Sequence, residues 1–164
     1  MKECYEILER LSAGYSYKNI FDIMCSFQGR IAAEYTGQNG KICKITYGEY
    51  EQRAKAAAAA ISKRLQQPGA VGIKLDNSPN WPTAVWGCLM AGHMPVLLDA
   101  RGERNVTEHL LGQTAAVGII TEEEGYQGYT VMKPEEIFGG EAGDFVPQWE
   151  DRICLCTSGT TGTS

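Results

Sequence analysis

The chain has 164 residues, of which 43% are hydrophobic and 21% are charged, and its formal net charge is −5. This length fits one domain of ordinary size, which can bury a core without disulfide bonds. Acidic and basic residues are interspersed, and no basic stretch indicates a nucleic-acid partner. No apolar run approaches the length of a membrane-spanning helix. We therefore expect a globular domain with no nucleic-acid partner and no membrane span.

The six cysteines form no C-x-x-C pair, and His93 and His109 have no neighbours at the spacing of metal ligands. The N-terminus lacks the apolar region of a secretory signal. Free cysteines without such a signal predict a cytoplasmic protein, and we predict no metal site. Cys154 and Cys156 alternate along an expected strand, so they share one face, which we assign to the apolar core.

The first part of the chain has mainly helical periodicity. Residues 3–12 indicate a short helix, and apolar residues recur every three or four positions across residues 19–35, which predicts a second helix with Asn19 as its N-cap. Asn39-Gly40 predicts a turn between two short extended pieces, the second running from Ile42 to Ile45.

Helices and strands are then expected to alternate. Thr46 and Glu49 have the spacing of a capping box, which predicts a helix from there to about Gln66. Ser78 is the expected N-cap of a later helix, with Pro79 at its first position and Gly92 as its C-terminal stop. The other expected elements are strands at 70–75, 94–98, 117–121, 129–132 and 152–156, a helix from Asn105, and a single-turn helix within 133–151.

This alternation predicts an α/β fold with a mostly parallel sheet flanked by helices. We expect one subdomain over residues 1–164, with a helical lead-in at 1–40 and an α/β part at 41–164. Ligands of such sheets bind beyond the carboxyl ends of the strands.

The last expected strand leads into a segment made only of threonine, serine and glycine. Gly159 and Gly162 allow positive φ and close approach to a ligand, and the hydroxyls are uncharged donors. Such loops wrap phosphates after buried strands, whereas a disordered tail would not need the strand. Neither a Walker loop nor a dinucleotide fingerprint occurs. The predicted phosphate-binding residues are Thr157, Ser158, Gly159, Thr160, Thr161, Gly162 and Thr163.

This segment resembles the signature loop of the AMP-forming, or adenylate-forming, ligase superfamily. That superfamily includes acyl-CoA synthetases, adenylation domains of peptide synthetases and firefly-type luciferases. Residues 157–162 match six consecutive positions of the signature, whose next lysine would lie beyond Ser164. Cys156 stands where an aromatic or small residue is common, and Ser164 where proline is frequent.

Two further matches occur in the family's order, so the resemblance spans roughly residues 20–164. Residues 45–50 resemble the early L-T-Y-x-E-L motif. Residues 89–92 and 95–99 resemble the L-K-A-G and P-L-D segment, with Leu97 in place of the usual proline.

The resemblance implies the N-terminal subdomain of an enzyme that joins a small-molecule carboxylic acid to a thiol. Its members form an acyl-adenylate from ATP with Mg²⁺, and coenzyme A or a carrier-protein thiol then displaces AMP. The 157–163 loop would hold the ATP phosphates. The catalytic residues, the metal ligands and most of the acid pocket would lie downstream, so we expect a truncated fragment that forms no adenylate alone. We also expect its uncovered face to make a homodimer or to limit its stability.

Three alternatives remain open at this stage. The acyl-CoA synthetase branch, which includes enzymes of fatty acid metabolism, is favoured over a peptide-synthetase adenylation domain, because of Leu97 and the absence of a trailing carrier domain. A non-catalytic binding module with the same fold is the second alternative. An unrelated phosphate-binding α/β protein is the third, and it requires the two earlier matches to be chance.

Overall fold

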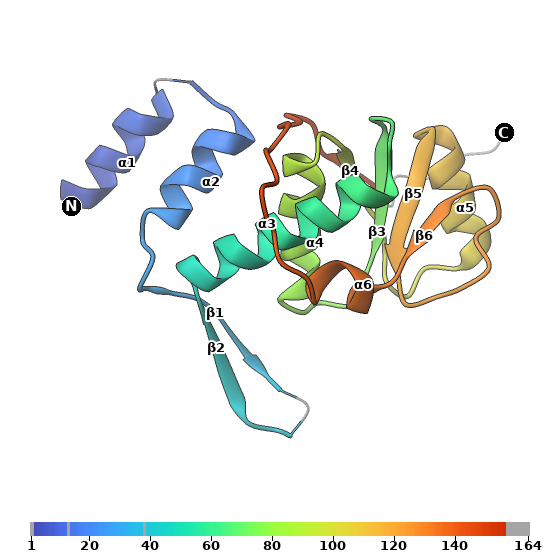
Figure 1. The fold of residues 1–164 in the computed structure, drawn as a ribbon, viewed down its shortest axis with the longest axis horizontal. Helices are drawn as coiled ribbons and strands as arrows, with labels where there is room; N and C mark the ends of the chain where they lie inside the picture. The colour runs from blue at the N-terminus through green and yellow to red at the C-terminus, as the bar shows by residue number, and fades with distance from the viewer. Residues whose placement is uncertain (1, 13, 38, 157–164) are drawn as a thin grey trace, which may run out of the picture.

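A computed structural model describes residues 2–156 except residues 13 and 38 (Figure 1). We call residues 2–46 the N-terminal arm and residues 47–156 the α/β body. The arm contains helices α1 (Lys2–Ser12) and α2 (Tyr17–Cys25) and strands β1 (Ile31–Thr36) and β2 (Ile42–Thr46). The body contains α3 (Tyr47–Arg64), β3 (Ala70–Lys74), α4 (Asn80–Met90), β4 (Met94–Leu97), α5 (Arg104–Gln113), β5 (Ala116–Thr121), β6 (Thr130–Met132), α6 (Pro134–Phe138) and β7 (Cys154–Leu155).

The helix predicted over residues 19–35 is wrong in both its start and its end. Ser16 is the N-cap of α2, and its hydroxyl accepts a hydrogen bond from the backbone N–H of Asn19 at 3.1 Å. The helix ends at Cys25, and residues 31–36 form a strand that pairs antiparallel with β2. Short apolar runs have an ambiguous period, and here pairing with a second strand decided the conformation.

The hairpin of β1 and β2 projects from the molecule (Figure 1). Its turn is where Asn39-Gly40 predicted it. Gly40 has a φ of +73°, and the Asn39 side chain accepts a hydrogen bond from the N–H of Lys41 at 3.0 Å. The turn prediction is therefore confirmed, because it depended only on local backbone preferences.

The capping box at the start of α3 is also confirmed. The Thr46 hydroxyl accepts from the N–H of Glu49 at 3.2 Å, and the Glu49 carboxylate accepts from the N–H of Thr46 at 2.8 Å. The alanines of α3 allow α4 to come close, since a Cβ added to Gly87 would lie 2.9 Å from that of Ala57. These two helices therefore pack backbone to backbone.

The central sheet has five strands in the order β6-β5-β3-β4-β7, and every neighbouring pair is parallel. Its core strand β3 is buried along its whole length. The mostly parallel sheet flanked by helices is thus confirmed. Strand β7, expected over 152–156, has only Cys154 and Leu155 in the ladder.

The predicted start of α4 is off by one residue. Pro79 is its N-cap and Ser78 makes no capping bond from its side chain; instead the backbone carbonyl of Ser78 accepts from the N–H of Trp81 at 3.1 Å. The stop at Gly92 is confirmed by its φ of +77°. A Cβ there would lie 2.7 Å from the carbonyl oxygen of Gln148, so glycine is required on both counts.

The two faces of the sheet are covered by different helices (Figure 1). Val71 and Ile73 of β3 share a buried cluster with α3, α4 and α6. Ala70 and Ile119 share a second cluster with Leu111 of α5. Consequently the chain leaves β3 toward one face and leaves β4 toward the other.

Candidate functional site

The predicted phosphate loop, from Thr157 through Ser158, Gly159, Thr160, Thr161 and Gly162 to Thr163, lies outside the residues that the structure describes. Its point of attachment is described. Strand β7 is parallel to β4, and Leu155 lies opposite Leu97. The chain therefore reaches residue 156 at the carboxyl edge of the sheet, which is the edge where ligands of parallel sheets bind.

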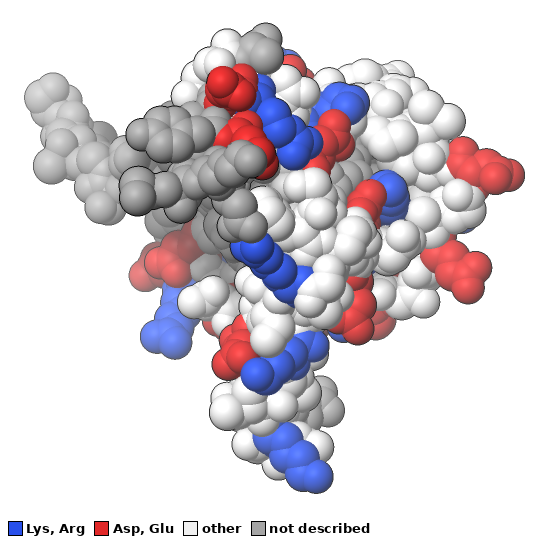
Figure 2. All heavy atoms as spheres, turned by 90° about the vertical axis from the view of Figure 1, so that its left-hand side faces the viewer, with Lys and Arg blue, Asp and Glu red and all other residues white. Residues whose placement is uncertain are grey.

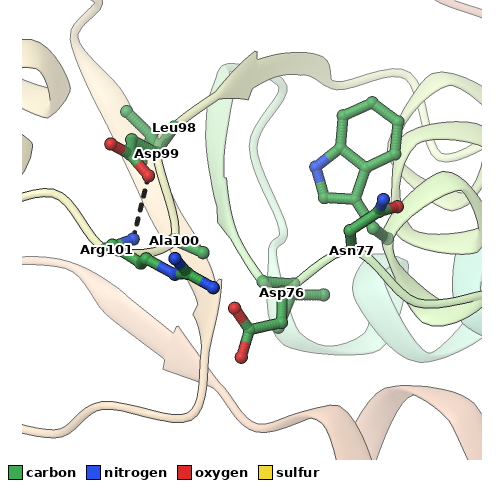
Figure 3. A pocket seen from close by; sticks show the side chains of 8 residues that line it. Asp76, Asn77, Leu98, Asp99, Ala100 and Arg101 are labelled. Carbon is green, nitrogen blue, oxygen red and sulfur yellow. Dashed lines mark hydrogen bonds between the residues drawn. The ribbon is translucent and has the colours of Figure 1, made fainter.

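A crevice of about 530 Å³ opens at this carboxyl edge (Figure 3). It lies between the segment that follows β3 and the segment that follows β4, which diverge toward opposite faces of the sheet. Such a divergence leaves space that no crossover helix covers. The lining residues are Leu75, Asp76, Asn77, Trp81, Leu98, Asp99, Ala100 and Arg101.

Polar side chains of opposite charge face each other across this crevice. Asp99 is committed to its own loop, because its carboxylate accepts a hydrogen bond from the N–H of Arg101 at 2.9 Å. The side chains of Asp76 and Arg101 point toward one another (Figure 3). Neither makes a hydrogen bond or an ion pair with any other described residue, so both are available to a ligand.

A network of polar side chains connects the end of β3, the segment after β5 and the start of α5, next to the crevice. Lys74, the last residue of β3, has a side chain only 2% exposed, and its ammonium pairs with the Glu123 carboxylate at 2.5 Å. The buried Tyr126 donates to the other Glu123 oxygen at 2.7 Å. Arg104, at the start of α5, lies over the Tyr126 ring at 4.5 Å and donates to the carbonyl of Glu124. The ends of three neighbouring segments are thereby tied together.

This network shifts the pKa of each member in a consistent direction. Burial alone would lower the pKa of Lys74, but its hydrogen bonds to Glu123 and Tyr126 outweigh burial and raise it. The hydrogen bond from Lys74 lowers the pKa of Glu123. Burial, aided by Glu123, raises the pKa of Tyr126. Near neutral pH the network therefore contains an ammonium–carboxylate pair.

Sequence reasoning missed this network and the crevice. A signal for Lys74 was present, since a lysine inside an otherwise apolar buried strand needs a partner. The partners follow β5, 49 and 52 residues later in the chain, and no local pattern connects them to Lys74.

The two histidines differ in their surroundings. His109 is exposed on α5. His93 is buried, and its Nδ1 has no hydrogen-bond partner among the described residues. Burial lowers the pKa of His93, and a hydrogen bond with the backbone of Gly69 offsets this only in part.

The described residues contain no group of three or more His, Cys, Asp or Glu side chains that could hold a metal ion. Acidic and basic side chains are intermixed on the face seen in Figure 2. None of the helices within the described ranges is long and apolar enough to cross a membrane.

Comparison with known protein families shows to which family this chain belongs. The model of the family described as "AMP-binding enzyme" matches residues 26–164. The chain belongs to the AMP-binding enzyme family. The match includes all three motifs and the whole segment 157–163, so the resemblance drawn from the motifs is confirmed.

Among curated members, this AMP-binding chain is similar to a component of the plipastatin synthase of Bacillus subtilis (strain 168). The two are 26% identical over 120 residues, which cover 71% of this chain and 5% of that protein. The chain therefore spans only a small share of that relative's length.

Solved structures share the fold. The N-terminal subdomain of Klebsiella oxytoca NpsA in complex with anthranilyl-AMSN has a TM-score of 0.76 and 22% identity, over 90% of this chain and 39% of that one. An artificially fused adenylation–PCP di-domain, NpsA-ThdA of the same organism, has a TM-score of 0.73 and 20% identity, over 87% and 28%. The AMP-binding chain thus has the fold of an adenylation-domain N-terminal subdomain and spans well under half of these chains.

Proposed function

We propose that this chain is the N-terminal part of a peptide-synthetase adenylation domain. Such a domain activates a carboxylic acid with ATP and passes the acyl group to the thiol of a carrier protein. The observation that carries the proposal is the family match over residues 26–164, which includes the phosphate-loop sequence. The similar proteins are peptide synthetases or their adenylation subdomains, and this favours the alternative reading over the acyl-CoA synthetase branch.

In this proposal, residues 157–163 hold the β- and γ-phosphates of ATP. Backbone N–H groups and hydroxyls would stabilise the charge that grows on pyrophosphate as the carboxylate attacks the α-phosphorus. Mg²⁺ would neutralise phosphate charge. The crevice at the same edge, with the side chains of Asp76 and Arg101 free, supports ligand binding there.

The test is ATP–pyrophosphate exchange with a panel of aryl and amino acids, measured on the protein that the gene encodes in full. Exchange with one class of acid is expected. Replacing both Thr160 and Thr161 with valine keeps their shape and removes two hydroxyl donors, and should reduce exchange about 100-fold. Thr36→Val, a remote change on β1, should leave the rate unchanged.

Two outcomes would replace the proposal. Thioester formation with coenzyme A and not with a carrier protein would identify an acid–CoA ligase. The absence of exchange with every acid would favour a non-catalytic module. The 164 residues measured alone are predicted to give no exchange.

A further inference from the structure

Cys154 and Cys156 form a close pair of thiols at the end of β7. Both side chains are half-buried and pack against the same cluster beneath α5, whereas Leu155 between them is 67% exposed. The two sulfurs therefore lie on one face of the strand, as period-two alternation requires. The neighbouring Cys154 thiol also contributes to a raised pKa of the Cys156 thiol.

The separation of the two residues lies at the limit of disulfide geometry. Two residues along a strand place the Cα atoms about 6.6 Å apart, and disulfides span Cα separations of roughly 4.4–6.8 Å, most often 5.5–6 Å. A bond between these sulfurs would pull the Cα atoms together by up to about 1 Å. Strand β7 would have to shorten.

Strand β7 is held weakly enough to shorten. Within the described residues it pairs only with β4, through Val96–Cys154 and Leu97–Leu155. By contrast, β3 is paired on both sides. Because β7 pairs with β4 at only two positions on the edge of the sheet, breaking this pairing leaves the other strand pairs intact. The strain of the disulfide would therefore be relieved within β7.

The other described cysteines lack these features. Cys25 and Cys88 are buried, and burial raises the pKa of Cys25 to about 12 and raises that of Cys88 further. Cys43 lies on the hairpin, where its thiol contacts the carbonyl of Lys41 at 3.8 Å. Only residues 154 and 156 are paired on one face among the cysteines whose side chains are described.

We propose that Cys154 and Cys156 are a reversible dithiol–disulfide site that loosens β7 from β4 when oxidised. The co-reactant is a small-molecule disulfide such as oxidised glutathione. One cysteine thiolate attacks it, forms a mixed disulfide and releases one glutathione thiolate. The second cysteine then displaces the second glutathione, so two protein thiols are oxidised and one glutathione disulfide is reduced to two thiols.

Burial, together with the neighbouring Cys154 thiol, raises the pKa of Cys156, so the reaction accelerates from about pH 7 to about pH 9. A strained bond is readily reduced, which makes the step reversible by reduced glutathione.

The test treats the full chain with oxidised glutathione, followed by intact mass and peptide mapping. We expect a loss of two hydrogen atoms located to the 154–156 peptide, restored by reduced glutathione. Amide hydrogen exchange of residues 94–97 should rise on oxidation while that of β5 stays unchanged. These measurements need no catalytic activity, so a negative result would reject the disulfide without bearing on the proposed function.

Variants decide between this site and general thiol reactivity. Cys156→Ser and Cys154→Ser should each abolish the intramolecular bond and stop at a glutathione adduct, while Cys43→Ser should form it normally. The proposal is overturned if the wild-type chain collects glutathione adducts at both positions without closing the bond. It is also overturned if the bond forms and the exchange of residues 94–97 does not change.

Discussion

The N-terminal arm and the α/β body are stabilised in different ways. In the body, β3 is buried along its whole length and is covered by helices on both faces. In the arm, the buried apolar side chains among the described residues are Phe21, Ile23, Cys25 and Ile45. The body therefore has a core of its own, whereas the arm depends on docking to it. We infer that the arm opens at a lower free energy than the body.

The contact between α3 and α4 should be the most sensitive point of the body. Gly87→Val would place new atoms against Ala57 and the backbone of Ala58, so we expect a loss of about 3 kcal/mol in unfolding free energy, measured by urea denaturation. Gly112→Ala on α5 is the matched control. A Cβ there is 3.9 Å from its nearest neighbour, and stability should rise by up to about 1 kcal/mol. Equal losses in both variants would contradict the close packing.

The buried ion pair should show an asymmetry between its partners. Glu123→Ala leaves the Lys74 ammonium buried with only the Tyr126 hydroxyl at 3.5 Å. We expect a loss of about 2 kcal/mol, below the usual range for a buried pair because the Glu123 side chain is 38% exposed. Lys74→Met removes the charge itself and should lose less than about 1 kcal/mol. Both unfolding free energies would be measured by urea titration. A larger loss of stability for Lys74→Met than for Glu123→Ala would show that an unpaired Lys74 charge is not what destabilises Glu123→Ala.

The packing of the arm against the body can be tested by mutating Phe21. This ring packs against Trp86 and Trp149 with centroid distances of 4.9 and 5.8 Å, and it is 2% exposed. Phe21→Ala should abolish hydrogen-exchange protection in α2 while leaving that of β3 and β5 intact. If protection falls equally in both regions, arm and body unfold as one unit and the comparison above is wrong.

The smallest expected effect is a pH dependence from His93. The pKa of His93 is lowered in the folded state from the ordinary histidine value of 6.5. As the pH falls below about 6.5, the unfolded chain therefore binds a proton at this position before the folded chain does. Stability is therefore full above that pH and declines down to the folded pKa, by at most about 1.4 kcal/mol per pH unit. His93→Gln should remove this slope from unfolding curves between about pH 7.5 and about pH 5.5. His109→Gln, on an exposed position, should retain it.

Much of the body could be predicted because its signals are local. The capping box of Thr46 and Glu49, the stop at Gly92 and the alternation of strands and helices each depend on residues close in sequence. The family motifs added the class of chemistry. The phosphate-binding role of residues 157–163 and the division at residue 40 stay predictions.

The sequence by itself determined the parallel α/β body and its family, since short-range caps, turns and periodicity agree with one another there. Only the tertiary structure decided the arm and the carboxyl edge. The N–H of Tyr17 donates to the Asp151 carboxylate 134 residues away, and Lys74 pairs with Glu123 49 residues away. Such contacts form only when distant segments have already folded together, and no local pattern carries that information.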